Sequence, residues 1–85
     1  MKHAGGAALD RLEPLLAVVR GFSGLREKSR GVFYRRSRAF LHFHEDPSGL
    51  YADMRSADGG SFDRLQVDDE TGRVELLRRL RVCGL

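Results

Sequence analysis

The chain has 85 residues, of which 41% are hydrophobic and 32% charged, with a formal net charge of +3. This size predicts one domain, and the apolar content excludes a disordered chain. No apolar run reaches the ~20 residues of a membrane-spanning helix, and the N-terminal residues do not resemble a signal peptide. The single cysteine, Cys83, excludes an internal disulfide. We therefore expect a cytoplasmic protein without membrane contact. Ile, Asn and Trp are absent and most cations are Arg, which points to a GC-rich, bacterial genome.

The N-terminal part predicts a leader and a helix. Residues 1–7 are small and Gly-rich, and we expect them to form a flexible leader ahead of a single domain of residues 8–85. Leucines and valines then recur at helical spacing as far as Arg20. Pro14 is best tolerated in a first turn, so the helix should begin near Asp10.

The middle of the chain predicts an antiparallel meander. Three segments carry the β-branched and aromatic residues typical of strands: 32–34, 39–44 and 50–55. The sequence Asp46-Pro47-Ser48-Gly49 is typical of a tight turn between the second and third segments. A loop should follow at 56–61, and residues 62–67 indicate a possible short fourth strand.

The C-terminal part predicts a second helix from Asp69 to Val82. Acidic residues stand at its start and arginines in its last turns, which complements the helix dipole at both ends. The predicted fold class is therefore α+β. We expect both helices on one face of a three-stranded antiparallel sheet, with the possible fourth strand at its edge.

The segment His42-Phe43-His44 is the most specific local pattern for chemistry. Two histidines that are two residues apart on a strand point to the same face, where they can bind one metal ion. The alternative interpretation is that His42 and His44 are half-buried sheet residues without a ligand. No nucleophile lies in a catalytic motif, so no catalytic residue is predicted.

The third metal ligand depends on the register of the hairpin. The turn chemistry favours a three-residue loop, in which Asp46 pairs with Leu50 and Asp53 faces away from the histidines. A shift by one residue would instead bring His42, His44 and Asp53 together. We expect the first register, and therefore no cofactor.

The charges are strongly segregated along the chain. Residues 20–38 carry seven cations against Glu27 alone, whereas residues 45–70 carry eight carboxylates against two arginines. A basic segment with neighbouring aromatic residues is typical of nucleic-acid binding. The candidate nucleic-acid-binding residues are Arg26, Lys28, Arg30, Arg35, Arg36 and Arg38. The acidic half opposes this hypothesis, because the two halves can neutralise each other within one chain or between copies.

In the expected register both faces of the sheet carry large apolar side chains. One face carries Phe40, Leu50, Ala52 and Met54, and the other Leu41, Phe43 and Tyr51. Two short helices cover one face only. We expect the face with Leu41, Phe43 and Tyr51 to form an interface in a homodimer, unless the leader and the 56–61 loop cover it.

The chain also resembles a known family in its first half. The series Gly24-Leu25-Arg26-Glu27-Lys28, Gly31-Val32-Phe33-Tyr34, Arg38-Ala39-Phe40 and Leu50-Tyr51-Ala52-Asp53 is similar to short uncharacterised bacterial proteins and, distantly, to the first half of the MmcQ/YjbR family. The similarity covers residues 9–55 and implies an α+β fold with a suspected DNA-binding role. This chain is shorter and lacks the family's C-terminal block, so no functional residue is carried over.

These patterns together predict a small, non-catalytic binding or interaction module that forms a homodimer. One alternative is a nucleic-acid-associated protein that uses the basic segment 20–38. The other is a metal-binding protein or hydrolase centred on His42 and His44.

Overall fold

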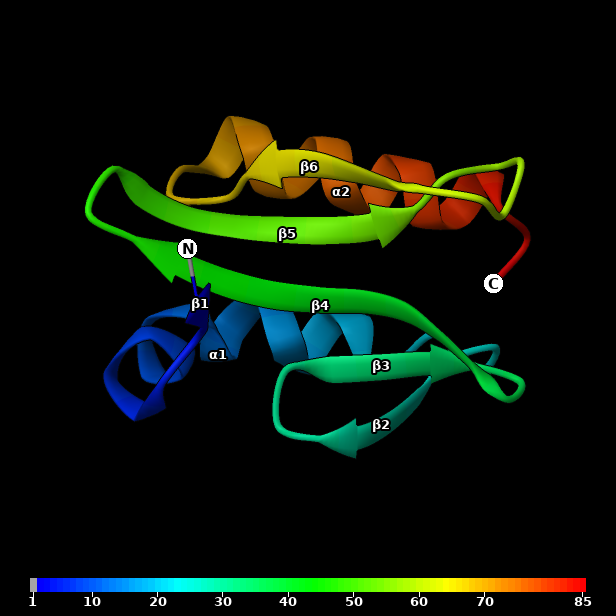
Figure 1. Ribbon diagram of the computed structural model, residues 1–85, viewed down its shortest axis with the longest axis horizontal. Coiled ribbons are helices and arrows are strands. Elements are labelled where there is room, and N and C mark those ends of the chain that lie inside the picture. Colours follow the sequence, from blue (N-terminus) through cyan, green and yellow to red (C-terminus); the bar gives the residue numbers. More distant parts are fainter. Residues whose placement is uncertain (1) are drawn as a thin grey trace.

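The computed structural model describes residues 2–85 as an α+β protein, in which two helices cover one antiparallel sheet (Figure 1). The helices are α1 (Gly6–Val19) and α2 (Glu70–Val82). The strands are β1 (Lys2–His3), β2 (Arg26–Ser29), β3 (Val32–Arg35), β4 (Arg38–Asp46), β5 (Gly49–Arg55) and β6 (Phe62–Gln66). Strands β2 to β6 follow chain order across the sheet, and β1 pairs with β4.

The sheet is larger than the predicted meander. The possible fourth strand is confirmed as β6, whereas β1 and β2 were not predicted. Strand β2 lies within the basic connector, where most of its residues are exposed. Its place in the sheet depends on backbone pairing with β3, for example between Arg26 and Tyr34, and exposed charged residues do not signal such pairing in a sequence.

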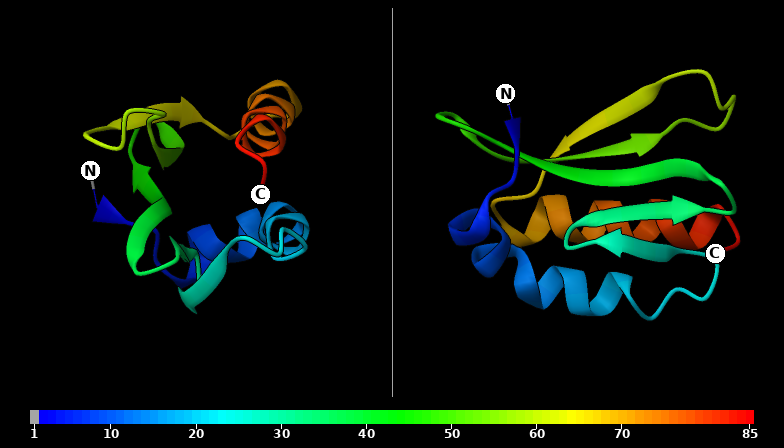
Figure 2. Two further views of the ribbon diagram at one scale, coloured as in Figure 1. Left: turned by 90° about the vertical axis from the view of Figure 1, so that its right-hand side faces the viewer. Right: turned by 60° about the horizontal axis from the view of Figure 1, so that its bottom comes forward.

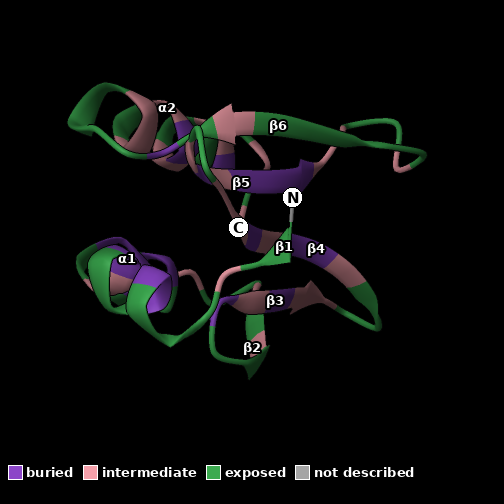
Figure 3. Cartoon of the chain, turned by 60° about the vertical axis from the view of Figure 1, so that its left-hand side comes forward, coloured by how far each residue is buried: buried purple, intermediate pink, exposed green. Residues whose placement is uncertain are grey.

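Both helices lie against the same face of the sheet (Figure 2). The buried residues are concentrated in the two central strands, β4 and β5, and on the helices, while β2 and β6 are largely exposed (Figure 3). Fully buried side chains from each layer meet in one core, including Leu16 of α1, Phe43 of β4 and Leu80 of α2. Within residues 2–85, no helix lies over the opposite face of the sheet.

The hairpin between β4 and β5 has the register that we did not expect. Asp46 pairs with Gly49, so the loop contains two residues rather than three. The expected pairing of Asp46 with Leu50 is therefore wrong by one residue. In the observed register His42 lies directly opposite Asp53.

Contacts outside the hairpin explain this register. Asp68, between β6 and α2, accepts a hydrogen bond from the backbone N–H of Leu50 at 2.9 Å, and the N–H of Val67 donates to the carbonyl of Leu50 at 2.8 Å. Gly49 has a φ of 145°, and a side chain at this position would collide with Asp68 and Gln66. Residues 66–68, which lie far along the chain from the turn, thus fix its position. The length of the turn is not decided by its own residues alone.

The same register places the large apolar side chains of the hairpin on the helix side. Leu41 pairs with Met54 and Phe43 with Ala52, and all four are buried. The expectation that Leu41, Phe43 and Tyr51 share an exposed apolar face is wrong for the first two, which are 0% and 1% exposed. A one-residue shift exchanges the faces of a strand, and here it collects the apolar residues on one side. Tyr51 remains on the other face, half-buried.

Helix α1 begins earlier than predicted. It starts at Gly6 rather than near Asp10, with Pro14 inside the helix. Segment 1–7, which we expected as a flexible leader, contributes Lys2 and His3 to the sheet. The turn before α1 is held by Glu45, whose carboxylate accepts from the backbone N–H of Gly5. Burial of the first turns under the sheet offsets the cost of an internal proline, which is ~3 kcal/mol.

Helix α2 is confirmed with its predicted polarity. Asp69 caps the N-terminus by accepting from the N–H of Gly72 at 3.0 Å, and Arg79 and Arg81 lie in the last turn. A Cβ atom at Gly72 would collide with the carbonyl oxygen of Gln66, so glycine lets this turn pack closely against the end of β6. Neither helix of residues 2–85 is long and apolar enough to cross a membrane.

Candidate metal centre

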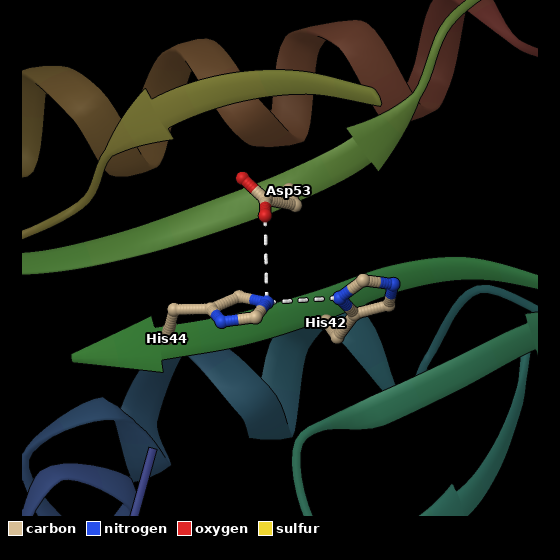
Figure 4. Close-up of side chains that lie close together, drawn as sticks. All are labelled: His42, His44 and Asp53. Carbon is tan, nitrogen blue, oxygen red and sulfur yellow. Dashed lines mark hydrogen bonds and ion pairs between the residues drawn. The ribbon is translucent and has the colours of Figure 1, made fainter. Parts of the chain in front are cut away.

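Three side chains with metal-binding atoms converge on the face of the sheet that the helices leave uncovered. His42 and His44 come from β4, and Asp53 comes from β5, directly opposite His42 (Figure 4). We call this cluster the histidine site. The sequence singled out the two histidines but placed Asp53 on the wrong face, and the observed register corrects this.

The three ligand atoms are close enough to share one ion. Nδ1 of His42 lies 3.0 Å from Nε2 of His44, and that same Nε2 lies 3.4 Å from Oδ2 of Asp53. One ligand atom from each of the three residues lies within 4.8 Å of the others. Two tetrahedral zinc ligands at ordinary bond lengths are separated by roughly 3.3 Å, so the spacing already suits such an ion.

Asp53 is held in its ionised form by an arginine. Its side chain is the one buried charged group that the structure records within residues 2–85, at 6% residue exposure. Arg64 of β6 donates to both carboxylate oxygens, from Nε at 2.7 Å and from the terminal nitrogen at 2.9 Å. These hydrogen bonds lower the pKa of Asp53 below its usual value. A carboxylate has about four lone-pair positions, so Oδ2 keeps one for a cation after binding Arg64.

Burial favours the neutral form of both histidines. Burial lowers the pKa of His42, and the neighbouring His44 lowers it further. Burial is also the main cause that lowers the pKa of His44, partly opposed by the charge of Asp53. Neutral imidazoles and an ionised carboxylate are the protonation states in which these groups bind a metal ion.

Neighbouring residues orient the two imidazole rings. His3 of β1 stacks on His44 with ring centroids 4.8 Å apart, and Phe62 of β6 lies 4.9 Å from the ring of His42. His44 also forms a backbone hydrogen bond with Lys2. Histidines that bind metals use backbone partners of this kind to fix the orientation of the ring. Strand β1, which was not predicted, thus supports the site.

A shared proton holds the site together when no ion is bound. Two ring nitrogens at 3.0 Å repel each other unless a proton lies between them, so either His42 Nδ1 or His44 Nε2 must donate to the other. A cation placed among the three ligand atoms would take the position of this proton. The arrangement can therefore exchange a hydrogen-bonded proton for a metal ion without rebuilding the strands.

The cations expected to bind nucleic acid are divided between two environments. Arg26, Lys28 and Arg30 belong to β2 and its turn. Arg30 is neutralised there by Asp10 and Glu13 of α1, each at 2.9 Å. The other three, Arg35, Arg36 and Arg38, lie at the turn between β3 and β4. Nucleic-acid binding by these residues stays a prediction.

No protein-family model, curated protein or solved structure matches this chain. The resemblance of residues 9–55 to the MmcQ/YjbR family stays a prediction. The functional argument therefore rests on the geometry of the described residues.

Proposed function

We propose that this protein is a small binding module for a divalent transition-metal ion, held by His42, His44 and Asp53. The observation that carries the proposal is the convergence of two imidazole nitrogens and a carboxylate oxygen from neighbouring strands, separated by 3.0 Å and 3.4 Å along the cluster. The histidine pair is visible in the sequence, whereas the choice of Asp53 as the third ligand follows from the register of β4 and β5.

Zinc fits this donor set better than magnesium or calcium does. Zinc accepts imidazole nitrogen and carboxylate oxygen at about 2.0–2.2 Å in tetrahedral sites, whereas magnesium and calcium prefer sets made of oxygen atoms. Three protein ligands leave a fourth position for water or for a group from a partner molecule. The bound ion would also link β4 to β5 and so stabilise the centre of the sheet.

The observations support metal binding more strongly than self-association. The homodimer was expected because an apolar face seemed to be left uncovered, but Leu41 and Phe43 lie under the helices. The uncovered face instead carries the histidine site together with Tyr51, Arg64 and the 37% exposed Phe62. This mixed face gives a second copy of the chain less apolar area to bury than the expected face, and self-association stays a prediction.

The test is a zinc titration in competition with a chromophoric chelator. The wild-type protein should bind one zinc ion per chain, and His42→Gln or His44→Gln should weaken binding by about 100-fold or more, because each removes a ligand atom. Asp63→Asn is the matched control. It removes an exposed carboxylate from the neighbouring strand β6 but leaves the three converging ligand atoms and the rings packed against them, so zinc affinity should change by less than about tenfold.

Circular dichroism shows whether each variant is folded. A variant with wild-type secondary structure that binds zinc weakly has lost a metal-binding side chain and not its fold. Zinc binding that survives in folded His42→Gln/His44→Gln protein contradicts the proposal. Absence of zinc binding in the folded wild-type protein contradicts it equally.

A further inference from the structure

A second candidate site lies at the end of the molecule where the turn between β3 and β4, the loop between β5 and β6 and the C-terminal end of α2 come together (Figure 1). These segments border an open cavity of about 390 Å³. Four arginines line it, Arg35, Arg36, Arg38 and Arg55, together with Phe40 and Cys83. We call it the arginine cavity.

Three of the four guanidinium groups of this cavity donate to backbone carbonyls and not to carboxylates. Arg55 donates to the carbonyl oxygens of Ala39 and Gly59, both at 2.8 Å, and Arg38 donates to Gly59 at 3.1 Å. Arg35 donates to the carbonyl of Cys83 at 3.4 Å. These hydrogen bonds position the arginines, but they leave the positive charges uncompensated.

Within residues 2–85, no carboxylate forms an ion pair with any of the four arginines or lines the cavity. Asp58, which lies between the lining residues Ala57 and Gly59, instead accepts from the hydroxyl of Ser56 and the N–H of Gly60 inside its own loop. Four cations around one cavity repel each other, and a bound anion would remove that repulsion.

The backbone at Arg36 adds an independent observation. Arg36 has a φ of 60° and is the one residue other than glycine with positive φ among residues 2–85. A side chain in this conformation is strained, and glycine would occupy the position at lower cost. Arg36 lies in the two-residue turn that joins Arg35 to Arg38, a turn of the kind that needs positive φ, yet the position carries an arginine that lines the cavity.

The other lining residues indicate the rest of the ligand. Phe40 is buried, and Arg35 lies over its ring at 5.7 Å from the centroid. A cavity of this volume lies at the small end of the range for small-molecule sites, which runs from about 300 to 1,000 Å³. Arginine is the side chain best suited to bidentate binding of phosphate oxygens.

We propose that the arginine cavity binds the phosphoryl group of a small phosphomonoester, whose apolar part lies against Phe40. A phosphomonoester carries up to two negative charges and three terminal oxygens, which match several guanidinium donors. This proposal uses none of the residues of the histidine site and does not depend on zinc binding.

Phenyl phosphate is a suitable probe, because it combines the phosphoryl group with an apolar ring. The binding constant should be measured by calorimetry and by amide chemical shifts of residues 35–40 and 55–59, at fixed ionic strength. The wild-type chain should show saturable binding. Arg36→Gly and Arg38→Gln should each weaken it by about tenfold, the effect of removing one charged hydrogen-bond donor.

Arg78→Gln is the matched control, since Arg78 is an exposed arginine that pairs with Glu75 of the same helix. It lowers the net charge by the same amount as the cavity variants and should leave phenyl phosphate affinity unchanged. The thermal melting of each variant shows whether it has folded.

Three outcomes overturn the proposal. The first is absence of saturable phenyl phosphate binding to the folded wild-type chain, and the second is equal weakening by Arg78→Gln and the cavity variants. The third concerns a single-stranded oligonucleotide. If it binds through the same arginines and phenyl phosphate does not displace it, the cavity belongs to a nucleic-acid surface instead.

Discussion

The charges of the histidine site are balanced, whereas those of the arginine cavity are not. In the histidine site, Arg64 balances Asp53, and neutral imidazoles complete the cluster. In the arginine cavity, guanidinium groups donate only to backbone carbonyls and keep their net charge. A balanced cluster of lone pairs suits a cation that replaces a shared proton, whereas an unbalanced cluster of donors suits an anion. The two regions therefore predict ligands of opposite sign on one small chain.

Asp53→Asn should give the largest difference between the change in zinc affinity and the change in phenyl phosphate affinity. The amide keeps the size of the side chain but is a much poorer zinc ligand, so zinc affinity should fall by about 100-fold or more. Phenyl phosphate affinity should stay within about twofold of wild type, because Asp53 does not line the arginine cavity. Calorimetric titration of both ligands into one preparation measures the difference. Parallel losses of both affinities would show that the regions are coupled.

Zinc should raise the thermal stability of the wild-type chain. At a free concentration of 100 times the dissociation constant, one bound ion contributes about 2.7 kcal/mol, which raises the melting temperature of a domain of this size by roughly 10–20 °C. A chelator should reverse the shift. Scanning calorimetry of His42→Gln/His44→Gln protein provides the contrast, since its melting temperature should not respond to zinc.

Arg36→Gly should increase stability while weakening the arginine cavity. Glycine relieves the backbone at φ 60° and removes one of four repelling cations, so the free energy of unfolding should rise by about 1 kcal/mol. Urea denaturation measures this change. Arg38→Gln should show no gain from backbone relief, because Arg38 does not have positive φ. A destabilised Arg36→Gly variant would mean that the turn does not carry this strain.

The smallest effect concerns arginines that do have carboxylate partners. Glu13 of α1 accepts from Arg20 and Arg30, which lowers its pKa from 4.5 to about 2. A lowered pKa contributes stability that is complete above pH 4.5 and is lost as the pH falls towards 2. Glu13→Gln should reduce the fall of the melting temperature between pH 4.5 and pH 2, and the effect should be modest because the Glu13 side chain is 42% exposed. Substitutions in the arginine cavity should leave this dependence of the melting temperature on pH unchanged.

The fold class and the C-terminal helix could be predicted because their signals are local. Asp69 stands before the apolar residues of α2, and Arg79 and Arg81 stand in its last turn. One short segment of sequence therefore predicts both ends of the helix. Strand β6 and the hairpin strands were likewise identified from residue type. Strands β1 and β2 were missed because their exposed residues show no alternation, and backbone pairing alone places them in the sheet.

The third ligand of the histidine site could not be predicted because it depends on register. Local turn chemistry favours the three-residue loop, whereas the contacts of Asp68 and Val67 with Leu50 fix the shorter one. The arginine cavity was missed for a related reason. Arg55 is separated from Arg36 by two strands in sequence, and only the folded sheet places both at one end.

The two-residue loop of the hairpin has a consequence for recognising relatives of this chain. Insertion of one residue beside Pro47 or Ser48 would leave every histidine and aspartate in the sequence, yet it would turn Asp53 away from His42. The length of this loop should therefore matter more to the histidine site than its composition does. In a set of homologues, a conserved spacing of eleven positions between the first histidine and the aspartate, counted from His42 to Asp53, would be more diagnostic of the site than the histidine pair itself.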